Sequence, residues 1–550
     1  MTAGLVLATA GTLLAFSTGL ADRYALPKFL VLSLGTCMAW LGLARKARKE
    51  GFPLGRTPLD LPMLALLAAA VLAAVFSLDP VLSVLGHYRA RFNSFLAWAL
   101  CMALFQATAR AEDGAHRRLL DACLAAGAFA GLYAVAQRLG LEPFPGVVEE
   151  VTGNRSYSTM GSPVYLGSVL LMLLPLALYR GGAPGAVSGL LMAAGLAATL
   201  SRGAWLGALA GCGLYLGRKR LSWRWALALL ACAGIAVLAG SVLRPRAVAD
   251  SSRVELWRCA SRISLKHPLL GTGPETFKLA FRKERSERYV RLLGPTSVQA
   301  FAHNDLLEAA CGTGLFGLAA YLWLLWGVFR VFRPWDDRCA ALGGGLLGLF
   351  MQMKLNPAPS AAYALAAAFA GVLAAPWVRK GLKGGARVPA AVFAACCVVF
   401  LAAARMAAAD RERKLGRFED AIRIAPWEMH YRFLYFQALH KRGGIQRSLE
   451  VSREAMRRHQ RDFDALQLYG VSLVLAKDRL QEAREVLERA QGLDPYFLPL
   501  YDNRIALARM TGDAASASAL EAELAGLKTR LGALPGGGAP APGQPPPPQG

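Results

Sequence analysis

Long apolar segments recur along most of this chain, and they constrain its fold more than any other feature. A helix needs about 20 apolar residues to cross the roughly 30 Å hydrocarbon layer of a membrane. Because lipid satisfies no backbone polar group, such segments predict transmembrane helices. The candidate spans are 3–20, 26–43, 59–78, 93–108, 119–137, 163–180, 184–200, 203–217, 224–243, 311–332, 338–354, 359–377 and 388–406. We therefore predict an all-α polytopic membrane protein with about 12 or 13 transmembrane helices.

The composition agrees with this class of protein. The chain has 550 residues, of which 55% are hydrophobic and 18% are charged, whereas soluble domains average about 25% charged residues. Its net charge is +25, from 62 Lys and Arg against 37 Asp and Glu. Basic cytoplasmic loops and a site for an anionic, phosphate-bearing lipid both explain such a charge in a membrane protein. No nucleic-acid-binding signature occurs, so we expect no nucleic-acid partner.

The residue patterns of several common sites are absent. The ten cysteines are scattered, mostly in apolar segments, and form no Cys-x-x-Cys pair. This predicts small buried side chains, without a disulfide framework or zinc site. The sequence also lacks a P-loop, a G-x-S-x-G motif and a paired-carboxylate motif. We expect no metal and no cofactor.

Basic residues between the spans predict an orientation. They concentrate in the loops 44–58, 218–224 and 378–387, with smaller groups at 109–118 and 330–338. Cytoplasmic loops carry an excess of Lys and Arg. With a cytoplasmic N-terminus, whose first apolar segment we expect to be a retained membrane helix, alternation of the spans puts all five of these segments inside. The segments 138–162 and 244–310, and everything after 406, then lie outside.

The sequence divides into five regions. Three helical stretches, centred on Ala421, Ala455 and Ala490, follow one another at a spacing of 34 or 35 residues. This period resembles tetratricopeptide (TPR) repeats. Such repeats bind a partner or a glycan, but the same helices can form a cap without a ligand. The predicted regions are N-terminal spans 1–243, a large loop 244–310, C-terminal spans 311–406, TPR-like repeats 407–533 and a disordered Pro/Gly tail 534–550.

Several outer residues are candidates for binding an anion. Arg202 lies in a turn between two spans, where a charge is costly unless it is paired or faces a cavity. A guanidinium binds phosphate oxygens through two parallel hydrogen bonds, although a structural ion pair would also account for Arg202. Arg253 lies four residues before Trp257, on the same face of a predicted helix. Arg89 and Arg155 lie in outer segments and are weaker candidates.

His303 lies where the large loop re-enters the membrane, just before a helix predicted from about Cys311. A histidine at this position can be a simple interfacial residue. Together with outer arginines, it also suits chemistry on an activated anionic donor such as a lipid diphosphate sugar. A neutral imidazole could accept the proton of an attacking hydroxyl.

Four motifs occur in an order that resembles the O-antigen ligase and O-antigen polymerase superfamily of bacterial membrane glycosyltransferases. They are the Ser201-Arg202-Gly203 turn, the Arg253…Trp257 pair, the segment 268–273 and the block 302–317. The resemblance implies a GT-C-type fold in the bacterial inner membrane, with the large loop and the repeats in the periplasm. It also implies metal-independent, inverting transfer of a glycan from undecaprenyl diphosphate to an acceptor.

The resemblance further implies a role for individual residues. Arg202 and Arg253 would hold the diphosphate, and His303 would accept a proton or position the acceptor. The remaining candidates for substrate binding are Arg89, Arg155, Arg258, Asn304 and Glu308.

The acceptor stays open between a lipid A core, a growing glycan and a protein, and we prefer a ligase to a polymerase. The non-enzymatic alternative is a lipid-glycan transporter, or an assembly factor whose repeats recruit a protein partner. Transporters often consist of repeated halves, and no such repeat is visible here.

Overall fold

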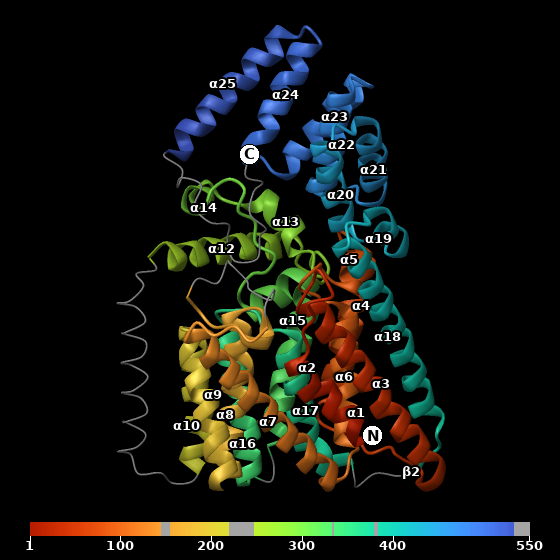
Figure 1. The fold of residues 1–550 in the computed structure, drawn as a ribbon, viewed down its shortest axis with the longest axis vertical. Coiled ribbons are helices and arrows are strands. Elements are labelled where there is room, and N and C mark those ends of the chain that lie inside the picture. Colours follow the sequence, from red (N-terminus) through yellow and green to blue (C-terminus); the bar gives the residue numbers. More distant parts are fainter. Residues whose placement is uncertain (145–153, 219–246, 333–334, 379–382, 533–550) are drawn as a thin grey trace.

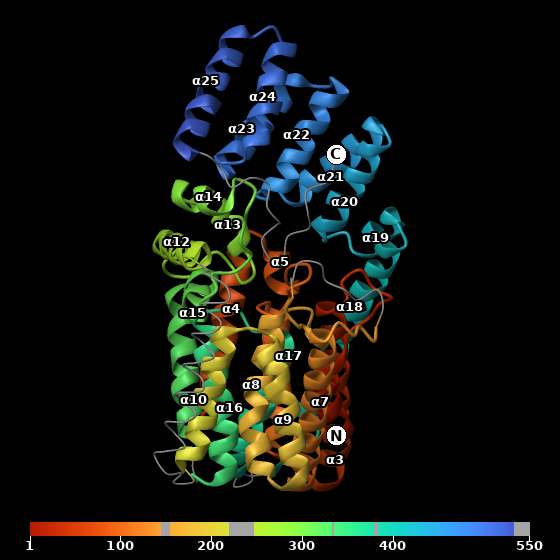
Figure 2. The same cartoon turned by 60° about the vertical axis from the view of Figure 1, so that its left-hand side comes forward.

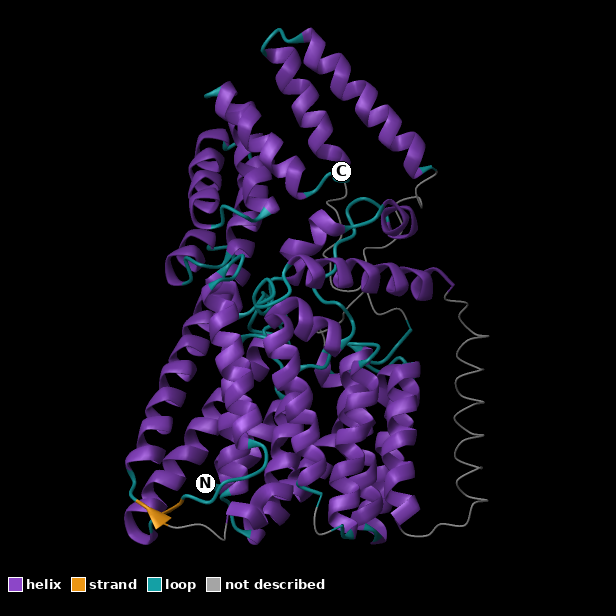
Figure 3. Ribbon diagram, turned by 180° about the vertical axis from the view of Figure 1, so that it is seen from behind, coloured by secondary structure: helices purple, strands orange, loops and turns teal. Residues whose placement is uncertain are grey.

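The computed structural model describes residues 1–144, 154–218, 247–332, 335–378 and 383–532. Within these ranges nearly all regular structure is helical, as Figures 1 and 3 show. This confirms the prediction of an all-α protein. The predicted span 224–243 and the predicted tail 534–550 lie outside the described residues.

A bundle of roughly parallel helices forms the lower part of the molecule in Figure 1. Every predicted span within the described ranges coincides with a helix of this bundle. Six of these helices, α3, α7, α8, α15, α17 and α18, are long and apolar enough to cross a membrane. The chain is therefore a multi-pass membrane protein. The bundle contains α1 (Thr2–Val6), η1 (Leu7–Gly11), α2 (Thr12–Leu14), α3 (Ala25–Glu50), α4 (Asp60–Val75), α6 (Phe95–Ala109), α7 (Asp113–Arg138), α8 (Pro163–Arg180), α9 (Gly182–Ala198), α10 (Arg202–Arg218), α15 (Asp305–Arg330), α16 (Asp337–Met353), α17 (Ser360–Val378) and α18 (Arg387–Lys414).

Two further layers lie above one end of the bundle, which we call the α12 end (Figures 1 and 2). The middle layer contains α5 (Pro80–Leu85), η3 (Ser158–Met160), α12 (Ala247–Lys266), α13 (Phe277–Glu284) and α14 (Glu287–Leu293). Above it lie α19 (Phe418–Ile424), α20 (Met429–Lys441), α21 (Ile445–Arg458), α22 (Phe463–Ala476), α23 (Leu480–Leu493), α24 (Leu498–Met510) and α25 (Ala514–Leu531). These seven helices, which we call the C-terminal helices, occupy the predicted repeat region, and their assignment to the TPR class stays a prediction.

The basic loops meet at the opposite end of the bundle. Strand β1 (Phe52–Pro53) pairs antiparallel with β2 (Lys383–Gly384), which joins the loops 44–58 and 378–387. Arg110 Nε donates to the Pro53 carbonyl at 3.1 Å, so the linker that follows α6 lies there as well. Spans that alternate in direction place these three loops at the same end of the bundle, as observed.

Glycines set the distance between α10 and α16. A Cβ atom added at Gly207 would lie 2.5 Å from the Gly348 carbonyl oxygen, and one at Gly211 would lie 2.5 Å from that of Gly344. Small residues let membrane helices approach until their backbones touch. The pairing is antiparallel, so the first turn of α10 lies beside the last turn of α16.

Helix α15 differs from its predicted boundary. It begins at Asp305 instead of near Cys311, and its backbone is interrupted at Gly314 (φ 63°, ψ −161°). The interruption leaves carbonyls of the first half free to accept from the segment 268–273. The Thr272 and Gly273 amides donate to the carbonyls of Cys311 and Gly312 at 2.7 and 3.0 Å. This motif of the sequence therefore ties the middle layer to α15.

The α10–α16 contact predicts different effects of two alanine substitutions within one helix. Gly207→Ala forces its Cβ against a backbone carbonyl, and we expect a loss of about 1–3 kcal/mol of unfolding free energy. Gly213→Ala is the control, because a Cβ there meets no described atom within 4 Å, and alanine favours a helix by about 1 kcal/mol over glycine. Denaturant unfolding of the purified protein measures both. Equal stability of the two variants would contradict the close contact.

Candidate active site

Asn356 joins two of the predicted arginine segments at the α12 end. The Arg253 guanidinium, on α12, donates to the Asn356 side-chain oxygen at 3.2 Å. A Cβ atom at Gly203, next to Arg202 at the start of α10, would lie 3.0 Å from the Asn356 side-chain nitrogen. Asn356 follows α16, so the glycine contact between α10 and α16 brings these groups together. Arg253 and the Arg202 turn, which are far from Asn356 in the sequence, thus both lie next to the Asn356 side-chain amide.

His303 lies within the electrostatic reach of Arg253. Burial, reinforced by the positive charge of Arg253, lowers the pKa of His303 to about 4. The imidazole is therefore neutral at pH 7. Among the described residues its buried Nδ1 has no hydrogen-bond partner. A φ of 54° also places His303 in the left-handed region, which is strained for a non-glycine residue and is frequent at functional sites.

The residues after His303 form the N-terminus of α15. The Asn304 side-chain oxygen caps this helix by accepting from the amides of Leu306 and Leu307 at 3.0 and 3.2 Å. The Asn304 amide group also donates to the Lys354 carbonyl at 3.3 Å. The Lys354 ammonium in turn donates to Asp305 at 2.6 Å. The short segment after α16 therefore carries both the partner of Arg253 and the cation that neutralises Asp305.

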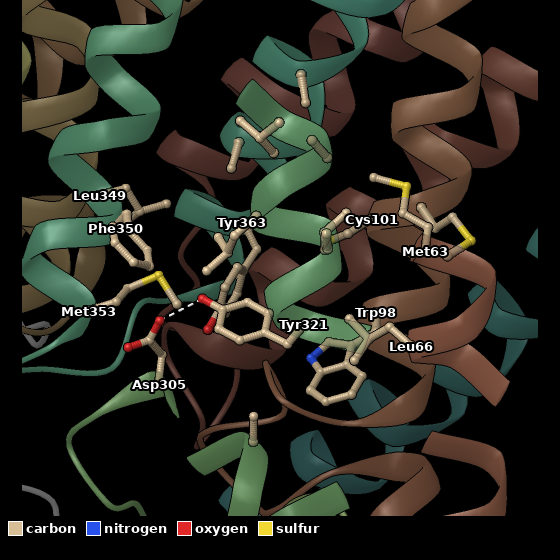
Figure 4. A pocket seen from close by; sticks show the side chains of 18 of the residues that line it. Met63, Leu66, Trp98, Cys101, Asp305, Tyr321, Leu349, Phe350, Met353 and Tyr363 are labelled. Atoms are coloured by element: carbon tan, nitrogen blue, oxygen red, sulfur yellow. Dashed lines mark hydrogen bonds between the residues drawn. The ribbon is translucent and has the colours of Figure 1, made fainter. Parts of the chain in front are cut away.

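A cavity of about 300 Å³ lies in the bundle, and its lining includes Asp305. It is bordered by α4, α6, α15, α16 and α17, and most of its lining is apolar. Figure 4 shows Asp305 hydrogen bonded to Tyr321 at the edge of this space, with Trp98, Met63 and Phe350 among the lining side chains. Its polar lining residues are Asn93, Glu275, Asp305, Glu308, Tyr321 and Tyr363. An apolar space with a few polar groups in its lining suits an amphiphile.

Glu275 lies at this polar rim and is almost fully buried. Its carboxylate accepts from the backbone amide of Asn93 at 2.7 Å and more weakly from that of His87 at 3.4 Å. Burial raises the pKa of Glu275 to about 7, although these two amides act in the opposite direction. Glu275 therefore fastens the loop 86–94 to the rim of the cavity.

The other predicted substrate-binding residues have different surroundings. Arg155 Nε donates to the Thr199 carbonyl at 2.9 Å, at the end of α9 and close to the Arg202 turn. Glu308 accepts from the Ala302 amide at 2.7 Å and lines the cavity.

Arg258 is exposed and pairs with Glu255 on its own helix. Arg89 is also exposed and lies over the ring of Tyr88 at 5.8 Å. The structure therefore brings Arg253, the Arg202 turn, His303 and Asn304 together, and it places Arg89 and Arg258 in other environments.

Sequence reasoning missed Lys354, Asn356 and Glu275. Lys354 and Asn356 follow a predicted span, in the stretch Lys354-Leu355-Asn356-Pro357. Alternation of the spans puts this stretch on the same side as the large loop, which was the available signal. Glu275 lies two residues after the segment 268–273 and was not singled out as a candidate.

The fold and this cluster define a class of protein: a multi-pass membrane protein with arginine, asparagine and histidine side chains gathered at one end of its bundle and an apolar cavity among its helices. Residues 187–322 match a family model described as O-antigen ligase. The matched segment contains Arg202, Arg253 and His303, and it confirms the resemblance to the O-antigen ligase family. This family has a glycosyltransferase-like role in O-antigen or polysaccharide assembly. A search of curated proteins found no match.

The capping geometry predicts that Asn304 stabilises α15. Asn304→Ala removes the acceptor for two amides and should lower the unfolding free energy by about 1 kcal/mol, whereas Asn304→Asp keeps a capping oxygen and should lose less. Asn503→Ala, at a partly exposed position of α24, is the control and should stay within about 0.5 kcal/mol of the parent. Denaturant unfolding measures these differences. An unchanged Asn304→Ala protein would argue that Asn304 serves the ligand instead.

Proposed function

We propose that this protein transfers a glycan from a polyprenyl-diphosphate-linked donor to an acceptor hydroxyl at the periplasmic face of the bacterial inner membrane. The observation that carries this proposal is the meeting of Arg253 with the Arg202 turn at Asn356, beside a neutral His303. The apolar cavity, whose lining includes Asp305 two residues after His303, gives a polyprenyl chain a place to lie. The reaction type is that of an O-antigen ligase.

Each group has a defined part in the proposed reaction. The guanidinium groups of Arg202 and Arg253 hold the diphosphate and stabilise the negative charge that grows on it as it leaves. The acceptor oxygen forms a bond to the anomeric carbon while the bond from that carbon to the diphosphate oxygen breaks. His303 Nδ1 takes the proton that the acceptor hydroxyl loses. Attack opposite the leaving group inverts the anomeric carbon, and no metal is needed where arginines neutralise the diphosphate.

The position of the cluster favours an enzyme over a transporter. A transporter carries its substrate through the bundle and needs binding groups near the midplane of the membrane. Here the charged groups gather at the α12 end, and the part of the cavity that enters the bundle is mostly apolar. This arrangement suits a donor whose lipid stays in the membrane while its polar end reacts at the surface.

Substitution of the three central residues tests the proposal. In a purified assay with a lipid-linked glycan donor, we expect Arg202→Ala and Arg253→Ala each to lower kcat about 100- to 1000-fold. His303→Ala should lower kcat by a similar or larger factor, since general-base catalysis contributes about 100- to 10,000-fold. Lys266→Gln, at the exposed end of α12, is the control and should keep full activity. Transfer that survives all three alanine substitutions would exclude the proposed site.

The pKa of His303 predicts the pH dependence of transfer. Because this pKa is lowered from 6.5 to about 4, His303 stays able to accept a proton until the pH falls to about 4. The acid limb of the kcat profile should therefore lie near pH 4. In Arg253→Gln the nearby positive charge is lost, so the limb should move to higher pH. A limb near pH 6.5 in the parent protein, unmoved by Arg253→Gln, would contradict this role for His303.

A further inference from the structure

The C-terminal helices use buried charges to contact the rest of their own chain. Arg282 of α13 donates to Asp464 at 2.7 Å and to Asp494 at 3.0 Å, and Asp494 also pairs with Arg285. Asp494 and the Arg285 side chain are fully buried. His459 reaches Asp79, before α5, at 3.2 Å. These contacts hold the C-terminal helices over the α12 end of the bundle, the arrangement seen in Figure 2.

One of these contacts acts on the loop 86–94. Arg91 of this loop forms an ion pair with Glu428, the N-cap residue of α20, at 3.1 Å. Both side chains are buried, with 3% and 11% of their surface exposed. Beside them Tyr88 donates to Asp410 at 2.8 Å and stacks on His430 at 4.4 Å. The loop is therefore attached to α18 and α20 through its own side chains.

The backbone of this loop is strained. Arg89 and Arg91 have φ values of 65° and 28°, in the left-handed region that non-glycine residues rarely adopt. A Cβ at Gly86 would lie 2.7 Å from the Arg91 Cα atom, so the chain folds back tightly on itself. Such a conformation persists only where the surroundings hold it. The buried Arg91–Glu428 pair is one of the contacts that hold it.

The other side of the same loop faces the candidate active site. The Asn93 amide donates to Glu275 at the rim of the cavity. The Phe92 ring stacks on Phe301 at 4.9 Å, two residues before His303. A change in the path of the loop would therefore move both the rim of the cavity and the segment that carries His303.

We propose that Glu428 and Arg91 are positioning residues for glycan transfer, through which the C-terminal helices hold the loop 86–94 against Glu275 and Phe301. The inference rests on the proposed function and adds to it. The C-terminal helices then complete the active site, in addition to any binding of a partner. Glu428 acts through the loop and does not touch the substrate.

Two readouts test this inference. Glu428→Gln removes the charge and keeps the shape of the side chain. We expect trypsin to cut the native protein after Arg89 or Arg91 at least ten times faster in this variant, and kcat for transfer to fall at least tenfold, with KM for the lipid-linked donor within about threefold of the parent. Glu419→Gln removes an exposed carboxylate that pairs with Arg447 in the same region. It should change neither readout.

Restoring the charge pair separates positioning from folding. Arg91→Glu combined with Glu428→Arg should recover part of the lost kcat and of the resistance to trypsin at Arg89, the cleavage site that this variant keeps. A merely structural pair would lower the yield of folded protein and leave kcat per folded molecule unchanged, which would overturn the inference. Arg91→Gln, which removes the other charge of the pair, takes the place of Glu428→Gln should the latter fail to fold. It should be cut faster after Arg89 and should have a lower kcat, as expected for Glu428→Gln.

The outcomes distinguish this inference from the proposed function. Unchanged cutting in Glu428→Gln overturns the contact. Faster cutting with unchanged transfer overturns the coupling, while the transferase proposal stands provided that Arg202→Ala is inactive. A parent protein that transfers no glycan overturns the proposed function, and the inference with it.

Discussion

The close contact between α10 and α16 determines where the groups of the candidate active site lie. Glycines at a spacing of four residues allow the two backbones to touch at Gly207–Gly348 and Gly211–Gly344. Once these pairs are in register, the first turn of α10 lies beside the segment that follows α16. Asn356 is then in place to bind Arg253. Packing between glycines, which have no functional side chain, thus brings Arg253 and Asn356 together.

The segment that follows α16 also neutralises a buried charge at the α12 end of the bundle. Asp305 lies at the rim of an apolar cavity, where an isolated carboxylate would be costly. Lys354 neutralises it, and Tyr321 donates a hydrogen bond to it. Arg253 donates to the Asn356 amide oxygen of the same segment. One short segment thus supplies a cation to Asp305 and a hydrogen-bond acceptor to Arg253.

The sequence was sufficient for the bundle but only for part of the site. The apolar segments predicted the spans correctly because every helix that crosses a membrane must itself be long and apolar. The start of α15 was misplaced by about one and a half turns, since its first turn is polar and caps itself through Asn304. His303 and Arg202 were predicted from their positions at the membrane boundary, and Arg253 from its spacing to Trp257 together with the family resemblance; their roles stay predictions. Asn356 was missed because its contact with Arg253 spans 103 residues of sequence, and no local pattern reports such a pair.

The 34- to 35-residue spacing predicted the C-terminal helices but not what they contact, and the energetics of that contact bear on catalysis. Removing one partner from a buried ion pair costs about 3–5 kcal/mol. Separation of the C-terminal helices from the middle layer would expose Asp494, Arg282 and Arg285 together. These charges would be hydrated again, but their ion pairs would be lost. The buried contacts therefore hold the C-terminal helices on the middle layer, and with them the loop 86–94 keeps its strained path.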